Sequence, residues 1–108
     1  MVAIPHRLSP LTHAADHVKV YESLASGRAV VATPTRALEP LAARGLVRLA
    51  AAAGDFEKAI LAAAAEGPEE FARRRAFARE NTWNHRAAAL EPAISSLFAA
   101  SPAAATSP

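Results

Sequence analysis

A run of five small residues, AVVAT at positions 29–33, constrains the fold of this chain most. A continuous apolar run of this length is typical of a strand covered on both faces of a parallel sheet. The preceding segment, residues 18–26, has helical apolar spacing. Its apolar side chains are Val18, Tyr21, Leu24 and Ala25. Gly27 stands where a helix commonly ends in a left-handed residue. The sequence therefore predicts a helix followed directly by a buried strand.

The rest of the chain continues this alternation. The other predicted elements are a strand at 2–5, a polar loop at 6–16, a short helix or turn at 35–45, a strand at 46–50, and helices at 55–66, 68–81 and 83–98. Asp55 is the expected N-cap of its helix, and Pro68 suits the first turn of the next. Alternation of this kind indicates an α/β domain with a short parallel sheet of three strands. Its core is expected to hold Val, Leu and Ile with Phe71, Phe77 and Trp83.

The length, net charge and cysteine content of the chain exclude several classes of protein. The 108 residues suffice for one small domain, and the net charge of +2 is too weak a basic bias to argue for nucleic acid. The chain has no cysteine, so thiolate metal sites and disulfides are excluded. The N-terminal segment has no apolar signal region, and no apolar run has the length of a membrane span. A cytoplasmic location is expected.

Lys19 is the residue whose position most needs an explanation. A cation in the first turn of a helix opposes the helix dipole, unless an anion binds at that helix end. Glu22 lies one turn further along the same face, and a carboxylate there could accept hydrogen bonds from two adjacent sugar hydroxyls. A phosphate partner beside a diol partner suggests a nucleotide. From spacing alone, an exposed Lys-Glu pair on a solvated helix face is the simpler interpretation.

The segment IPHRLSPLTHAADHVKVYESLASGRAVVATP, residues 4–34, resembles the donor-binding region of GT-B glycosyltransferases that use nucleotide sugars. The shared pattern is a strand ending in Pro, an Arg-containing loop, Lys-x-x-Glu, Gly, and a Val-Val strand ending in Thr. FEKAI and NTWNHRAAAL look like the closing helices of that family. The resemblance covers residues 2–94. It implies a partial Rossmann-like donor domain at 1–98, followed by a disordered Ala/Pro/Ser tail at 99–108.

The resemblance also implies roles for individual residues. Glu22 would bind the ribose hydroxyls, and Lys19, with Arg7, would face the diphosphate and stabilise charge on the leaving nucleotide. Thr12 and His13 would approach the diphosphate or donor sugar, and Gly27 would allow the tight turn into the strand. The nucleotide sugar is a substrate, and neither a cofactor nor an obligatory metal is implied.

The resemblance departs from the family pattern in two respects. Ala15 stands where many members carry a second Glu, seven positions before the ribose-binding one. The acceptor-binding domain and the first strands of the donor domain have no counterpart in the 108 residues. A missing N-terminal domain or a partner chain is therefore expected, and the full enzyme could associate peripherally with membranes. The isolated chain is expected to be inactive alone.

Three other interpretations remain. His13 and His17, four residues apart, could hold a metal with Asp16, but the segment is predicted to be a loop. The arginines of residues 73–79 could attract phosphates, although neighbouring glutamates favour a solvated helix face. The alternative function for the whole chain is a non-catalytic α/β module that binds a nucleotide or docks on another protein.

Overall fold

Three short parallel strands form the centre of the fold. The computed structural model describes residues 1–99. Its elements are β1 (Val2–Ile4), α1 (Pro10–Ala14), α2 (Val18–Ala25), β2 (Val30–Ala32), η1 (Arg36–Leu38), α3 (Glu39–Ala43), β3 (Arg48–Leu49), α4 (Ala53–Ala64), α5 (Pro68–Glu80) and α6 (Trp83–Ala99). The strands pair in the order β1-β2-β3, with Val2 opposite Val30 and Val31 opposite Arg48. The predicted α/β class with a three-stranded parallel sheet is confirmed.

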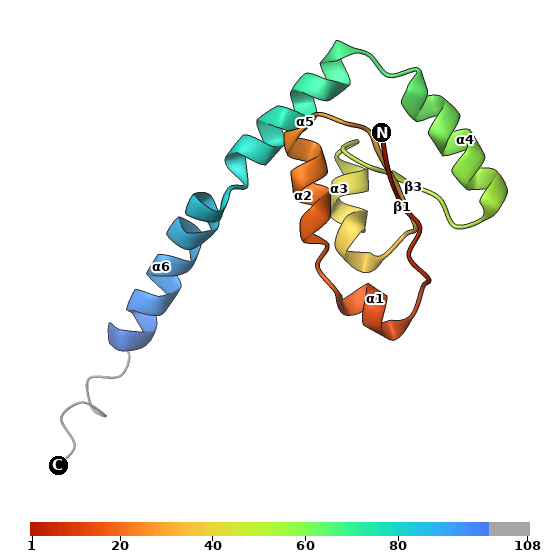
Figure 1. The fold of residues 1–108 in the computed structure, drawn as a ribbon. Helices are drawn as coiled ribbons and strands as arrows, with labels where there is room; N and C mark the ends of the chain where they lie inside the picture. The colour runs from red at the N-terminus through yellow and green to blue at the C-terminus, as the bar shows by residue number, and fades with distance from the viewer. Residues whose placement is uncertain (100–108) are drawn as a thin grey trace.

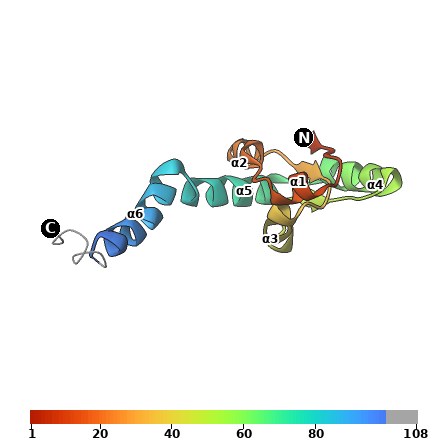
Figure 2. The ribbon, with the colours of Figure 1, turned by 90° about the horizontal axis from the view of Figure 1, so that it is seen from below.

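Helices cover both faces of the sheet, as the uninterrupted apolar β2 requires. Val30 and Ala32 point to one face, where side chains of α2, α3 and α5 complete the larger core cluster. Val31 points to the other face and packs with Ala63 of α4. Figures 1 and 2 show α4 on one side of the strands and α2 and α3 on the other. The arrangement is a thin three-layer sandwich, with α2 connecting β1 to β2.

Several element boundaries differ from the sequence-based predictions. The predicted loop at 6–16 contains the helix α1, because Ser9 and Thr12 form a capping box around Pro10. Asp55 is not an N-cap: α4 begins two residues earlier, and Asp55 lies in its first turn, where it still favours the helix dipole. Ala99 belongs to α6, and the rest of the predicted tail at 99–108 lies outside the described residues.

The predicted aromatic core is only partly correct. Phe77 is 8% exposed and belongs to the core, whereas Phe71 is 39% exposed and Trp83 is 76% exposed. Trp83 opens α6, which has no buried residue and extends away from the sheet (Figure 1). No helix within residues 1–99 is long and apolar enough to cross a bilayer.

Arg74 is buried, whereas Phe71 and Trp83, which were predicted to be in the core, are exposed. Its side chain is 2% exposed and pairs with Glu66. The prediction that the arginines of α5 form a solvated face is therefore wrong at this position. Arg74 lies on the same helix face as Phe77, three residues later, and shares its burial.

Candidate functional site

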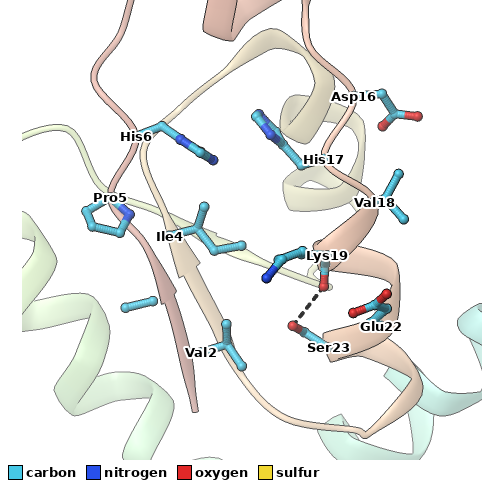
Figure 3. Close-up of a pocket in the computed structure, with 11 residues that line it drawn as sticks. Val2, Ile4, Pro5, His6, Asp16, His17, Val18, Lys19, Glu22 and Ser23 are labelled. Carbon is cyan, nitrogen blue, oxygen red and sulfur yellow. Dashed lines mark hydrogen bonds between the residues drawn. The ribbon is translucent and has the colours of Figure 1, made fainter.

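A cleft of about 690 Å³ lies between β1 and the first half of α2. Its lining residues are Val2, Ala3, Ile4, Pro5, His6, Asp16, His17, Val18, Lys19, Glu22 and Ser23. Figure 3 shows the two walls, with the β1 residues facing the start of α2. β1 is an edge strand, so this wall belongs to the outer strand of the sheet. The cleft thus combines a strand edge with a helix N-terminus.

The position of the α2 N-terminus follows from the β1-α2-β2 connection. In a parallel unit the connecting helix begins near the carboxyl end of the preceding strand, which is where ligands of α/β proteins commonly bind. His17 is the N-cap of α2 but makes no side-chain capping hydrogen bond, and no acidic residue stands in the first turn. The positive end of this helix is therefore available to an anion from the cleft.

Lys19 and Glu22 both line this cleft, as their spacing on one helix face predicts. Both side chains are exposed, and neither forms a salt bridge within residues 1–99. Figure 3 shows the Lys19 side chain turned toward β1. The Ser23 hydroxyl donates a hydrogen bond of 2.9 Å to the Lys19 carbonyl. The pair is therefore two separate polar groups rather than an ion pair.

Two histidines form the end wall of the cleft. The rings of His6 and His17 stack with centroids 4.6 Å apart and an interplanar angle of 18°. The His6 carbonyl accepts a hydrogen bond of 2.7 Å from the hydroxyl of Thr33, which fixes the chain after β1 against the end of β2. His17 Nε2 is buried and has no hydrogen-bond partner in the described part of the chain. His6 was not predicted as a site residue. Its position directly after Pro5, at the carboxyl end of a predicted parallel strand, is nevertheless typical of residues that line ligand sites.

The other predicted site residues before α2 lie outside this cleft. Arg7 is exposed, and its carbonyl accepts a hydrogen bond of 2.8 Å from the Thr12 hydroxyl. Thr12 thereby fixes the start of α1. His13 lies in a separate hollow of about 310 Å³ beside Arg36, whose backbone N–H donates to His13 Nδ1 at 3.3 Å. The structure groups Arg7, Thr12 and His13 around α1 and places none of them on the cleft wall.

Gly27 lies at the opposite end of α2 from the cleft entrance. Its φ of +77° is the left-handed conformation that the sequence predicted at this helix end. A Cβ atom here would lie 2.8 Å from Arg75 Nε and 3.2 Å from the Phe71 carbonyl oxygen. Gly27 therefore serves the turn into β2 and the close approach of α5, and it is not among the residues that line the cleft.

The predicted spacing of His13 and His17 does not produce a metal site. His13 lies in α1 and His17 is the N-cap of α2, and His13 Nδ1 already accepts a hydrogen bond from the Arg36 backbone N–H. No group of three His, Asp or Glu side chains among residues 1–99 converges as metal ligands would.

No protein-family model matches the chain, and neither does any curated protein or solved structure.

Proposed function

We propose that the chain is the latter part of a GT-B donor-binding domain, and that it binds the nucleoside diphosphate of a nucleotide sugar. One observation carries the proposal: the uncapped N-terminus of α2, Lys19 and Glu22 all border one cleft at the carboxyl end of β1. This combination offers an anion site beside a diol acceptor. The resemblance of residues 4–34 to donor-binding segments gives the same two residues the same two roles.

The chemistry of sugar transfer gives each group a task. An acceptor hydroxyl attacks the anomeric carbon as the bond from that carbon to the diphosphate oxygen breaks. Negative charge develops on the leaving diphosphate, which takes up the proton of the hydroxyl. The ammonium of Lys19 and the first amides of α2 would stabilise that charge in place. Glu22 would accept hydrogen bonds from the ribose hydroxyls.

Sugar transfer also needs a domain that binds the acceptor. The second half of α6 has four exposed large apolar side chains, at Leu90, Ile94, Leu97 and Phe98. Their spacing places them along one side of the helix. This surface supports docking of α6 on the acceptor-binding domain of the proposed enzyme. It equally suits the alternative, a non-catalytic module that docks on another protein.

Isothermal titration calorimetry of the whole chain with UDP and with GDP tests the proposal. We expect at least one nucleotide to bind, and we expect Lys19→Ala and Glu22→Ala each to weaken binding about ten-fold, the effect of losing one charge-assisted interaction of about 1.5 kcal/mol. Lys58→Ala and Glu57→Ala are matched controls, because both residues are exposed on α4, on the other face of the sheet.

The possible results separate the two functions. If Lys19→Ala and Glu22→Ala weaken binding while the α4 variants bind normally, the diphosphate and ribose assignments hold. If wild-type chain binds neither nucleotide, the donor-binding proposal is wrong for these nucleotides and the docking module is favoured. Equal losses in all four variants would indicate a general loss of folding rather than the loss of a contact in the cleft.

A further inference from the structure

The second half of α6 does not pack on the rest of the described chain. Figures 1 and 2 show this helix leaving the body beyond α5, with no other element beside it. No residue of α6 is buried. Pro92 inside the helix removes one backbone hydrogen bond, and each part on either side is shorter than the about 12–15 residues that an isolated helix needs in water. A surface from outside residues 1–99 is therefore expected to stabilise α6.

The apolar side chains of α6 follow the seven-residue repeat of a coiled coil. Along one side of the helix the apolar positions are spaced alternately by four and three residues, which is the spacing of a coiled-coil seam. The seam residues are Trp83, Ala87, Leu90, Ile94 and Leu97. In heptad notation Ala87 and Ile94 occupy a positions, and the other three occupy d positions. Ile at a with Leu at d is typical of two parallel helices.

The charges beside the seam fit the same pairing. Arg86 stands at a g position, and Glu91 stands at the e position five residues later. In two parallel helices in register, each g residue faces the e residue of the next heptad on the other helix, which is five positions later. Arg86 of one copy thus meets Glu91 of the second copy, and two-fold symmetry forms this pair twice. In an antiparallel pair g positions face g positions, so these opposite charges would not meet.

Both charges are available for this contact. Arg86 and Glu91 are exposed, and neither forms a salt bridge within residues 1–99. The guanidinium carbon of Arg86 lies 4.7 Å from the centroid of the Tyr21 ring. That contact uses the face of the guanidinium and leaves N–H groups at its edge for a carboxylate.

The proline of α6 lies on the side of the helix away from the seam. Pro92 occupies an f position, and the Ala88 carbonyl, which a backbone N–H at position 92 would otherwise bond, belongs to a b position. Both positions face outward in a coiled coil. The interrupted hydrogen bond therefore does not reach the surface that would be paired.

We propose that two copies of the chain associate through α6 as a short parallel two-stranded coiled coil. The apolar seam supplies the buried surface, and the two Arg86–Glu91 pairs set the parallel register. This inference goes beyond the proposed function and does not depend on nucleotide binding, because no residue of α6 lines the cleft between β1 and α2. The chain pairs with a second copy when no other domain covers this surface.

Sedimentation equilibrium of the full chain tests the inference. The seam is short, so we expect a weak dimer with a dissociation constant of about 100 µM, within a measured range of about 10 µM to about 1 mM. Leu90→Lys and Leu97→Lys each bring two like charges together in the seam, and each is expected to weaken pairing about ten-fold or more. Leu61→Lys is the matched control, because Leu61 is an exposed leucine of α4, and it should pair like wild type.

Reversal of the two charges tests the orientation of the helices. Arg86→Glu alone and Glu91→Arg alone make both contacts repulsive, and each is expected to weaken pairing about ten-fold. The double variant R86E/E91R should pair like wild type. An equimolar mixture of the two single variants should form heterodimers, because each glutamate of one chain then faces an arginine of the other.

The possible results separate a second copy from other occupants of the surface. A wild-type chain that stays monomeric throughout this range, or that forms assemblies larger than a dimer, would overturn the inference. Monomeric behaviour would favour a different protein domain as the partner of α6. A dimer that Leu61→Lys weakens as much as Leu90→Lys, or that charge reversal leaves unchanged, would also overturn it, because the paired surface or its orientation would differ. Thermal melts followed by circular dichroism establish that each variant is folded, which the exposure of all these positions favours.

Discussion

Arg74 connects three parts of the chain that are distant in sequence. Its guanidinium pairs with Glu66 after α4, and it donates to the Gly27 carbonyl at 3.1 Å and to the Leu46 carbonyl at 3.2 Å. The Glu66 side chain is 4% exposed and also pairs with Arg48 at 2.9 Å. Buried charges of this kind hold a fold together because each depends on its partner for compensation.

Replacement of Arg74 is therefore expected to be severe. Arg74→Met leaves the Glu66 carboxylate with only the half-exposed Arg48, and leaves two buried carbonyls without donors, so we expect a loss of about 3–5 kcal/mol in the free energy of unfolding. Urea unfolding followed by circular dichroism measures this. Arg73→Met, an exposed neighbour on α5, is the control and should change stability by less than about 0.5 kcal/mol. Similar losses in both variants would show that the ion pair is not the cause.

At the level of elements, the sequence predicts the presence of a helix better than the residues at which it begins and ends. The helices α2, α5 and α6 were predicted from local signals, namely apolar spacing, the proline at position 68 and the glycine at position 27. Each of these signals depends on only a few neighbouring residues. α1 escaped prediction because five residues carry no periodic pattern, although Ser9 and Thr12 held the capping signal. The burial of Arg74 escaped because it depends on contacts with Gly27 and Leu46, which no local pattern encodes.

The start of α5 makes the stability of this element sensitive to acid. Hydrogen bonds from the backbone, first from Glu70 itself and then from Gly67, lower the pKa of the Glu70 carboxyl below its ordinary value of 4.5, and Arg73 and Arg74 add to the effect. A lowered pKa in the folded state stabilises the fold above the ordinary pKa, and this contribution is lost as the pH falls through the lowered value.

We therefore expect Glu70→Gln to unfold more easily than wild type at neutral pH, and the difference to shrink as the pH falls below about 4.5. Thermal melts between neutral pH and pH 3 measure the difference. Glu69→Gln is the control, since Glu69 also stands in the first turn but makes no hydrogen bond to the described backbone, and its effect should be smaller. A Glu70→Gln difference that stays constant in acid would contradict the assignment to the carboxylate.

At the scale of the molecule, the spacing of residues in α2 predicts one wall of the candidate site but not the rest of it. The spacing of Lys19 and Glu22 predicted only that they share a helix face, and their proposed roles as site residues came from the resemblance of residues 4–34. The β1 wall of the cleft and the end wall with His6 could not be predicted from this pattern, because they depend on the position of β1 beside α2. Trp83 was expected in the core because large aromatic residues usually pack there, but the direction of α6 leaves it outside.

The whole molecule divides into a packed body, residues 1–82, and a projecting α6. No α6 residue is buried, and the aromatic contact between α6 and the body is that of Arg86 with Tyr21, an interaction of about 0.5–1 kcal/mol at an exposed site. A chain ending at Thr82 is therefore expected to keep its stability to within about 1 kcal/mol. Phe77→Ala in the body, by contrast, should lose about 3–5 kcal/mol.

Urea unfolding followed by circular dichroism compares the three proteins, because truncation removes the only tryptophan. Equal stability of the full and shortened chains would mean that the apolar side of α6, with Leu90, Ile94 and Leu97, is not needed for folding. That surface would then be available for the docking role proposed above. A shortened chain that unfolds as easily as Phe77→Ala would instead make α6 part of the folding unit, and its exposed apolar side chains would be evidence of packing rather than of docking.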